Sequence, residues 1–299
     1  MLNFIKLGKA IYNTNNPREA RRMVIFVIRA YIHYKQMRRL LAFFHQDKQH
    51  EKLLELNPYF YEQITRAFFY KDSNFTERTR LIEEHVDFLS SRLKQTIVEK
   101  LYDKQDVVLW QSEYEEKPLK FVLAFEPGQR KEGLLSVILR LDMCALYQIM
   151  FWIAKDKDMK WSMWIGAMQG PNIENSREII KKLTKQCHAY RTKNMILYAA
   201  QAVTRSLGLE RIYAVTNSGY YANNHLRKDR KLKTSFSDFW EEAGGKPSED
   251  KRFYELPLIE HRKTMEEVPT RKRAVYRKRF VLLDELDTAI YNSIDSLKL

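Results

Sequence analysis

The sequence predicts an α/β protein in which a helical N-terminal region, residues 1–104, packs on a mixed-sheet domain, residues 105–299. Helical spacing of apolar side chains dominates the first region, and short apolar runs at hairpin distance follow it. The stretch Lys160–Asn217 then has the pattern of a strand, a helix and a second strand. Because two strands joined through a helix form the connection that parallel pairing requires, this stretch predicts a parallel pair within the sheet.

The composition describes a basic protein with enough apolar side chains for a core. Hydrophobic residues make up 44% of the 299 residues and aromatic residues 13%, which excludes general disorder and allows one large or two modest domains. Lys and Arg number 52 against 38 Asp and Glu, so the formal net charge is +14. This excess of positive charge favours binding of an anionic partner, which could be nucleic acid, anionic lipid, acidic polysaccharide or a phosphorylated cofactor, and it does not distinguish these classes. A basic protein with no polyanionic partner is the alternative.

The cysteines and the N-terminal residues indicate the cellular compartment. Cys144 and Cys187 show no CxxC or Cys/His spacing, so we expect two buried thiols and a reducing cytoplasm. The N-terminus lacks the pattern of a secretory signal, and the apolar run Met23–Ile28 is too short to cross a bilayer. The sequence therefore predicts a cytoplasmic protein that is not integral to the membrane, with a peripheral position at the inner membrane as an option.

Four helices are predicted in the first region. They cover Pro17–His45 after the cap Asn16, Gln49–Leu56, Pro58–Phe69, and Thr76–Leu101 with Thr76 as the cap. The first helix is amphipathic and basic. Such a helix can dock on its own protein with its charges solvated, or it can lie on an anionic membrane surface, and the pattern alone does not separate these options.

Short apolar runs predict the strands of the sheet. An antiparallel meander is expected from Val107–Trp110, Leu119–Phe125, Leu134–Leu141 and Ala145–Ile153, with Asp142 at a bend. The parallel unit follows, with a strand at Trp161–Met168 and a long helix that ends at Gly208. Beyond it we expect a short helix at Ser237–Ala243, a strand at Phe253–Ile259, and a helix or strand-helix segment after the basic run Arg271–Arg279.

The start of the long helix could bind an anion. Arg191 and Lys193 stand where the helix dipole and the free amides favour negative charge. Because cations at this end oppose the dipole, a solvated basic helix start is the alternative. The histidines make no metal-ligand spacing, so we expect no metal. The common signatures of nucleotide binding and of hydrolases, GxGxxG, GxxxxGK[ST] and GxSxG, are absent.

Two family resemblances extend this interpretation. The segment AAQAVTRSLGLERIYAVTNS, at Ala199–Ser218, resembles GCN5-related N-acyltransferases, whose mixed sheet splays apart to hold acyl-coenzyme A. At closer range the chain resembles the VirK/YbjX family of bacterial proteins. The residues that carry this resemblance are Ile165–Pro171 (IGAMQGP), His188–Lys193 (HAYRTK), Ala214–Asn217 (AVTN), Asp238–Glu242 (DFWEE) with Gly244-Gly245, and Lys272–Phe280 (KRAVYRKRF).

The acyltransferase resemblance implies a set of site residues. The pantetheine strand would be Ile165, Gly166, Ala167, Met168 and Gln169, and the pyrophosphate contacts would be Arg191, Thr192, Lys193 and Asn194. The implied catalytic candidates are Tyr220 or Tyr221 as the acid, with Asn217 and His225; Glu126, Asp142 and His225 are the candidates for the base. The stretch HAYRTKN lacks the usual glycines, and the segment Asn172–Cys187 intervenes before it, so side-chain cations would replace backbone amides as phosphate ligands.

The family resemblance implies a role in cell-envelope integrity, virulence and resistance to cationic antimicrobial peptides. Whether the protein is an enzyme stays open: acyl transfer from acyl-coenzyme A to an amine or hydroxyl acceptor is the first hypothesis. A non-catalytic factor that binds anionic lipid, an envelope component or a protein partner is the second. Nucleic-acid binding, suggested by the charge and by Arg271–Arg279, comes last because few aromatic residues interleave the basic ones.

Overall fold

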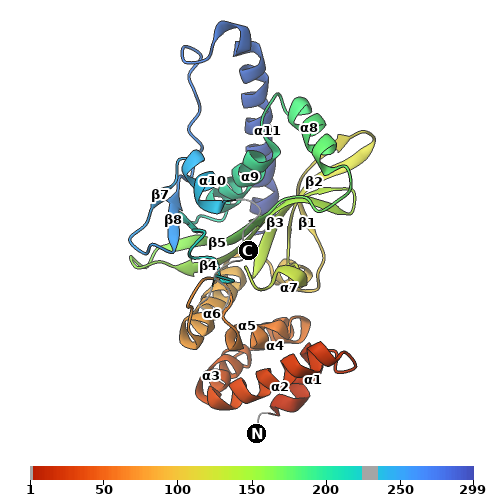
Figure 1. Cartoon of the computed structure of the whole chain (residues 1–299), viewed down its shortest axis with the longest axis vertical. Helices are drawn as coiled ribbons and strands as arrows, with labels where there is room; N and C mark the ends of the chain where they lie inside the picture. The colour runs from red at the N-terminus through yellow and green to blue at the C-terminus, as the bar shows by residue number, and fades with distance from the viewer. Residues whose placement is uncertain (1–2, 224–234) are drawn as a thin grey trace.

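The computed structural model describes residues 3–223 and 235–299 and shows a mixed α+β protein built around one open sheet (Figure 1). N-terminal helices lie on one face of the sheet, and helices of the C-terminal half cover the other. The described helices before the first strand are α1 (Phe4–Ile11), α2 (Pro17–Ile32), α3 (Tyr34–Phe44), α4 (Lys48–Leu56), α5 (Tyr59–Thr65), α6 (Phe75–Arg92) and α7 (Gln95–Tyr102). The division into domains between residues 104 and 105 stays a prediction.

The sheet has eight described strands in the order β1-β2-β3-β4-β5-β6-β8-β7. Their bounds are β1 (Val107–Tyr114), β2 (Lys117–Ala124), β3 (Leu135–Leu141), β4 (Cys144–Lys155), β5 (Trp161–Gln169), β6 (Arg211–Val215), β7 (Lys246–Pro247) and β8 (Phe253–Leu256). Neighbouring strands pair antiparallel except β5 and β6, which pair in parallel. The predicted meander and the predicted parallel pair are both confirmed.

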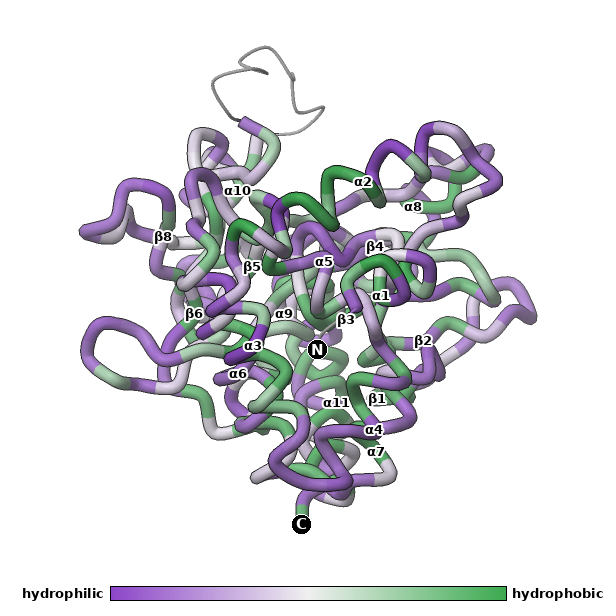
Figure 2. The backbone as a smooth tube through the Cα atoms, turned by 90° about the horizontal axis from the view of Figure 1, so that it is seen from below, coloured by the Kyte–Doolittle hydropathy of each residue, from purple (hydrophilic) through white to green (hydrophobic). Residues whose placement is uncertain are grey.

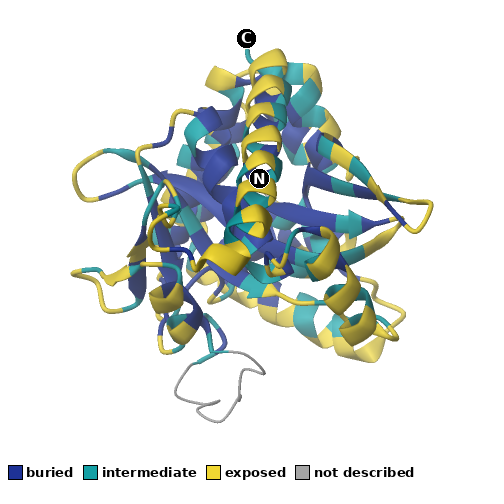
Figure 3. Ribbon diagram, turned by 90° about the horizontal axis from the view of Figure 1, so that it is seen from above, coloured by how far each residue is buried: buried dark blue, intermediate teal, exposed yellow. Residues whose placement is uncertain are grey.

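The remaining helices are α8 (Ser176–Gln186), α9 (Thr192–Ser206), α10 (Phe236–Glu242) and α11 (Arg273–Leu297). Helix α9 connects β5 to β6 and is buried along most of its length. It ends at Ser206, and Gly208 follows two residues later with a φ of +72°, which confirms the glycine predicted at this helix end. Helix α11 packs on α9 and β1 and buries Leu283, Leu286, Ile290 and Ile294, while its outer side is exposed above the buried strands (Figure 3).

The helix predicted from Pro17 to His45 is divided in two. His33 leaves helical geometry, with φ −104° and ψ 38°, and separates α2 from α3. Its imidazole stacks on Phe75, with ring centroids 4.2 Å apart. The break directs α3 onto α6, where Arg39 forms an ion pair with Glu83. Helical periodicity continues across the break, which is why the sequence did not reveal it.

The helix predicted from Thr76 to Leu101 is also divided, at Leu93. This residue pairs with Lys298 in an isolated β-bridge, and the backbone amide of Lys94 donates to the carbonyl of Leu297. Contact with the C-terminus thus replaces helical hydrogen bonds at this point. The N-terminal cap is Asn74, which forms a capping box with Glu77, and not Thr76 as predicted.

Two smaller predictions need correction. The strand expected at Phe253–Ile259 ends at Leu256, before Pro257, because proline has no amide hydrogen to continue a ladder. Cys187 is buried as expected, whereas Cys144 is exposed because it begins β4 directly after the turn at Asp142.

Candidate functional site

The parallel pairing of β5 and β6 stops before β5 ends, because β6 is the shorter strand and ends at Val215. Their pairing runs from Ser162 opposite Arg211 to Ile165 opposite Ala214, and β5 then continues to Gln169 without a partner on β6. We call this place the β5–β6 notch. Four of the five residues predicted for the pantetheine strand, Gly166 to Gln169, lie in it, and Ile165 is the last residue that pairs with β6. Ile165 and Ala167 are buried, and the side-chain oxygen of Gln169 accepts hydrogen bonds from Gln129 and Gln148 at 2.7 and 2.8 Å.

The loop between β2 and β3 lies across the notch on one face of the sheet. A Cβ added to Gly166 would stand 1.9 Å from the backbone oxygen of Glu132, so only glycine fits beneath this loop. The loop is fixed from its other side by α5. Arg130 forms an ion pair with the buried Glu62 at 2.6 Å, and the side-chain amide of Gln63 donates to the carbonyl of Arg130 at 2.8 Å.

Tyr220, a predicted acid, is buried beside the notch. Its hydroxyl donates a hydrogen bond to the carboxylate of Glu132. Burial, followed by the nearby charge of Glu132, raises the pKa of Tyr220. The raised pKa keeps the proton on the phenol and makes it a weaker acid than an exposed tyrosine. Tyr221, the alternative acid, is half-buried, with its ring 6.0 Å from that of Phe68.

The remaining candidates for catalytic residues have structural contacts of their own or lie elsewhere in the chain. The side-chain oxygen of Asn217 accepts from the amide of Phe236 at 2.7 Å, and its amide donates to Ser235 at 2.9 Å, so this residue ties β6 to the start of α10. Glu126 forms an ion pair with Arg140, and Asp142 is exposed in the turn between β3 and β4. His225 lies outside the described residues.

The predicted anion-binding helix start contacts a carboxylate of the same chain. Arg191 and Lys193, at the beginning of α9, both form ion pairs with Glu242 of α10. The hydrogen bond from Lys193, at 3.0 Å, lowers the pKa of Glu242 and keeps it charged. Thr192 is buried and Asn194 is half-buried. A free anion would therefore have to compete with Glu242 for these two cations.

A second surface is formed by α2. This helix buries only Phe26 and Ala30. Five bulky apolar side chains share the opposite side at positions i, i+1, i+4, i+7 and i+8, and we call them the α2 outer face. They are Val24, Ile25, Ile28, Tyr31 and Ile32, with exposed fractions of 53%, 39%, 53%, 57% and 71%. Seen from below in Figure 2, α2 carries hydrophobic segments next to hydrophilic ones.

Basic side chains flank the α2 outer face. Arg18 and Arg21 are exposed near the start of α2, and Lys35 and Arg38 are exposed on α3 just beyond its end. Helix α2 packs on α1, α3 and α5. The helix therefore docks on its own protein, which was one of the two alternatives predicted from its sequence. It still leaves a broad apolar face uncovered.

Two negative findings apply to the part of the chain that the structure describes. Within residues 3–223 and 235–299, no helix is both long and apolar enough to span a bilayer. The same residues contain no group of three or more His, Cys, Asp or Glu side chains placed to hold a metal ion.

Comparison with known proteins identifies the family. A model of the family described as "Protein of unknown function (DUF535)" matches residues 15–292. The chain belongs to the DUF535 family. No solved structure matches this chain, so the proposed kinship with N-acyltransferases stays a prediction.

Proteins from several bacteria are similar to this chain. An uncharacterized protein of Haemophilus influenzae is 31% identical over 129 residues, 43% of this chain and 42% of the relative. The uncharacterized protein YbjX of Escherichia coli is 32% identical over 159 residues, 52% of this chain and 48% of YbjX, which confirms the expected relation. The match to the membrane protein LapB of Mannheimia haemolytica is 24% identical over 197 residues, 63% of this chain and 80% of LapB. The chain thus spans less than half the length of the first two relatives.

Sequence reasoning missed two features of the site. Glu132 was not a candidate, because 88 residues separate it from Tyr220 and no local motif marks it. Glu242 belongs to the DFWEE motif that carries the family resemblance, but nothing in that motif shows that it faces Arg191 and Lys193.

Proposed function

We propose that this protein acts at the bacterial cell envelope by lying on the surface of an anionic membrane through the α2 outer face. The observation that carries the proposal is the exposure of five neighbouring bulky apolar side chains on one helix. Contiguous apolar surface of this kind marks interaction sites on soluble domains. The relative named membrane protein LapB supports a membrane as the partner.

The chemistry around the α2 outer face favours an anionic bilayer over a neutral one. An interfacial helix inserts its apolar side to the level of the acyl chains while basic residues contact the lipid headgroups. Arg18, Arg21, Lys35 and Arg38 are exposed at the two ends of the apolar face and can make such contacts. Each basic residue near an anionic surface contributes about 1 kcal/mol of attraction. The formal net charge of +14 acts in the same direction.

Vesicle sedimentation tests this proposal. We expect the wild-type chain to bind vesicles of phosphatidylethanolamine and phosphatidylglycerol, and to bind pure phosphatidylcholine weakly. Replacing Ile28 and Ile32 with glutamate should weaken binding to the anionic vesicles by roughly tenfold or more, because two apolar side chains no longer enter the interface. The matched control is Val281→Glu, an apolar residue with a similar exposed fraction of 56%, on α11 at the opposite side of the sheet (Figure 1).

Self-association is the competing explanation for an exposed apolar face. If the Ile28→Glu/Ile32→Glu variant turns a dimer into a monomer and binds anionic vesicles as tightly as wild type, the α2 outer face is a contact between copies and the proposal is wrong. Equal loss of vesicle binding in the Val281→Glu control would also contradict the proposal. The loss would then come from added negative charge anywhere on the protein and not from the α2 outer face.

Acyl transfer is the second candidate, and a specific observation favours it. At the β5–β6 notch β5 continues past the end of β6, which leaves its last residues without a partner on that side, and α9 begins with two cations where a phosphate would bind. We propose that acyl-coenzyme A binds there, with its pantetheine arm along Gly166–Gln169 and its phosphates at Arg191 and Lys193. An acyl group transferred to an envelope-related acceptor would link this activity to envelope integrity and peptide resistance.

Removal of Glu242 should strengthen coenzyme A binding. In Glu242→Gln the two cations lose their internal partner, so we expect affinity for acetyl-coenzyme A, measured by calorimetry, to rise roughly two- to fivefold. Arg191→Ala/Lys193→Ala should abolish binding. The matched control is Glu210→Gln, a half-exposed carboxylate that pairs with Lys160 at 3.1 Å elsewhere on the sheet. No saturable binding by wild type or by Glu242→Gln would rule out the acyltransferase candidate.

A further inference from the structure

A cavity of about 540 Å³ lies at the opposite end of β5 and β6 from the notch. It is bounded by the turn between β4 and β5, by β6 and by the hairpin of β7 and β8. Its volume falls within the range of small-molecule sites in proteins, about 300–1,000 Å³. Neither the α2 outer face nor the residues assigned to acyl-coenzyme A contribute to it.

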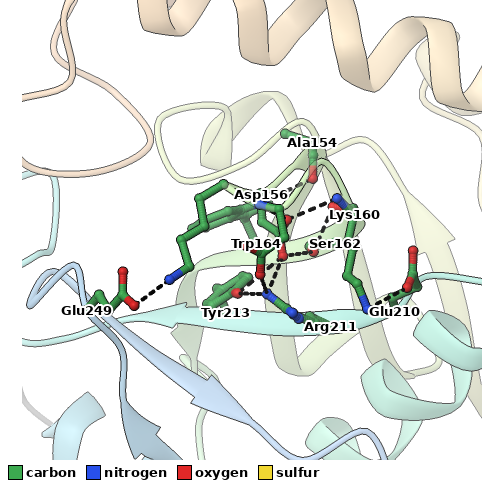
Figure 4. Close-up of polar contacts among 11 residues, drawn as sticks. Ala154, Asp156, Lys160, Ser162, Trp164, Glu210, Arg211, Tyr213 and Glu249 are labelled. Atoms are coloured by element: carbon green, nitrogen blue, oxygen red, sulfur yellow. Dashed lines mark hydrogen bonds and ion pairs between the residues drawn. The ribbon is translucent and has the colours of Figure 1, made fainter.

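Aromatic rings form one wall of this cavity. Trp164 of β5 stacks on Tyr213 of β6, with centroids 4.3 Å apart and planes inclined by 23°, and meets Phe253 of β8 edge-on at 4.9 Å. All three residues line the cavity, and Trp164 is only half-buried. The ring position is fixed, because the indole nitrogen donates a hydrogen bond to the carbonyl of Ala154 at 3.1 Å (Figure 4). A fixed aromatic surface beside an open volume attracts cations through the negative faces of the rings.

The rim of the cavity is acidic in a chain that is strongly basic overall. The carboxylates that line it are Asp156, Asp158, Glu249, Asp250 and Glu255, against the cations Lys157 and Arg211. Arg211 contacts Asp156 and Asp158, Lys157 contacts Glu249, and Arg252 contacts Asp250 from outside the lining. Five carboxylates and three cations leave a net charge of −2 at this site.

Glu255 is the carboxylate that remains for a ligand. It lies directly across the sheet from Tyr213, in the same row as Trp164, so the aromatic wall ends at its side chain. Glu255 is exposed, and its carboxylate makes no ion pair within the described residues. The site thus combines an aromatic wall, an available carboxylate and a volume large enough for an organic molecule.

We propose that this cavity binds a small organic cation, with an alkylammonium or guanidinium group against Trp164 and Tyr213 and a second positive charge near Glu255. A metal ion fits less well, because among the described residues no three His, Cys, Asp or Glu side chains are placed together to hold one. An anion is disfavoured by the net negative charge of the lining. Since the chain as a whole repels cations, saturable binding of a cation requires a local site of this kind.

A ligand series on the wild-type chain tests the aromatic part of the site without any substitution. Calorimetry would compare choline with 3,3-dimethylbutanol, which has the same shape and no charge, and putrescine with spermidine. We expect choline to bind at least fivefold more tightly than its neutral counterpart, and spermidine more tightly than putrescine. Equal binding of choline and the neutral alcohol, or no saturable binding of any cation, would overturn the proposal.

A pair of variants tests the acidic part. Glu255→Gln should weaken spermidine binding at least fivefold. Glu113→Gln should leave it unchanged, because Glu113 is likewise an exposed strand carboxylate but lies on β1, at the far edge of the sheet. Equal affinities of the two variants for spermidine would show that the cation binds elsewhere and would contradict the assignment. Vesicle and coenzyme A binding should be the same in both variants, since the cavity shares no residue with those surfaces.

Discussion

Replacing Gly166 with alanine should destabilise the protein by about 3 kcal/mol, at the upper end of the usual cost of overpacking a core. The added Cβ would stand 1.9 Å from the backbone oxygen of Glu132 and 2.9 Å from the ring of Trp152. The first contact is with backbone held by α5, so it cannot be relieved by a change of rotamer. The loop between β2 and β3 would have to lift from the sheet, which would also disturb the hydrogen bond from Tyr220 to Glu132.

Urea unfolding measures this effect against a matched glycine. Gly128 lies in the same loop, and a Cβ built there has no other atom within 4 Å. We expect Gly128→Ala to change the free energy of unfolding by no more than about 0.5 kcal/mol, the usual range for a surface position. Similar stabilities of Gly166→Ala and Gly128→Ala would show that the loop does not lie tightly on β5, and the account of the notch would then be wrong.

Lowering the pH from 7 to 5 should destabilise the protein through His85. This histidine is fully buried on α6, and burial lowers its pKa to about 3. Its Nδ1 accepts a hydrogen bond from the amide of Ile153 on β4 at 3.0 Å, so the folded state requires the neutral imidazole. The unfolded chain takes up a proton near the ordinary histidine pKa of about 6.5. Below that pH the unfolded state binds more protons, and stability decreases as the pH falls towards about 3.

The expected loss of stability follows from the difference in proton binding between the folded and unfolded states. Each pH unit in this window costs about 1.4 kcal/mol, so between pH 6.5 and pH 5 the contribution of His85 decreases by about 2 kcal/mol. The measurement is the free energy of unfolding in urea at pH 7 and pH 5 for wild type and His85→Gln. The other titrating groups affect both chains alike, so the variant should lose about 2 kcal/mol less than wild type. Equal losses would mean that His85 is not buried as a neutral base.

Local patterns in the sequence predicted the sheet well. The apolar runs from Val107 onward predicted the antiparallel meander, and the strand–helix–strand stretch predicted the parallel pair of β5 and β6. The helix breaks at His33 and Leu93 were not predictable, because each depends on a distant partner: Phe75 stacks on the first, and Lys298 pairs with the second. Helical periodicity continues through both positions.

The candidate sites were predicted only in part. The basic amphipathic character of α2 was visible, but apolar residues occur around much of the helix, so the pattern could not show that Ile28 and Ile32 face outward. The cations of α9 were identified, whereas their partner Glu242 comes from another helix. The aromatic wall of Trp164, Tyr213 and Phe253 joins three strands across the sheet and has no signature in the linear sequence.

The depth of a spin label on α2 tests the central claim most directly. Ile28→Cys in a Cys144→Ser background gives one reactive thiol, because Cys187 is buried. In the presence of anionic vesicles, we expect collision with oxygen and with a nickel complex to place the label at position 28 about 5–10 Å below the lipid phosphates. The same label at Val281→Cys, on α11, should remain in water. A label at position 28 that stays in water while the protein is bound to vesicles would show that another surface contacts the membrane.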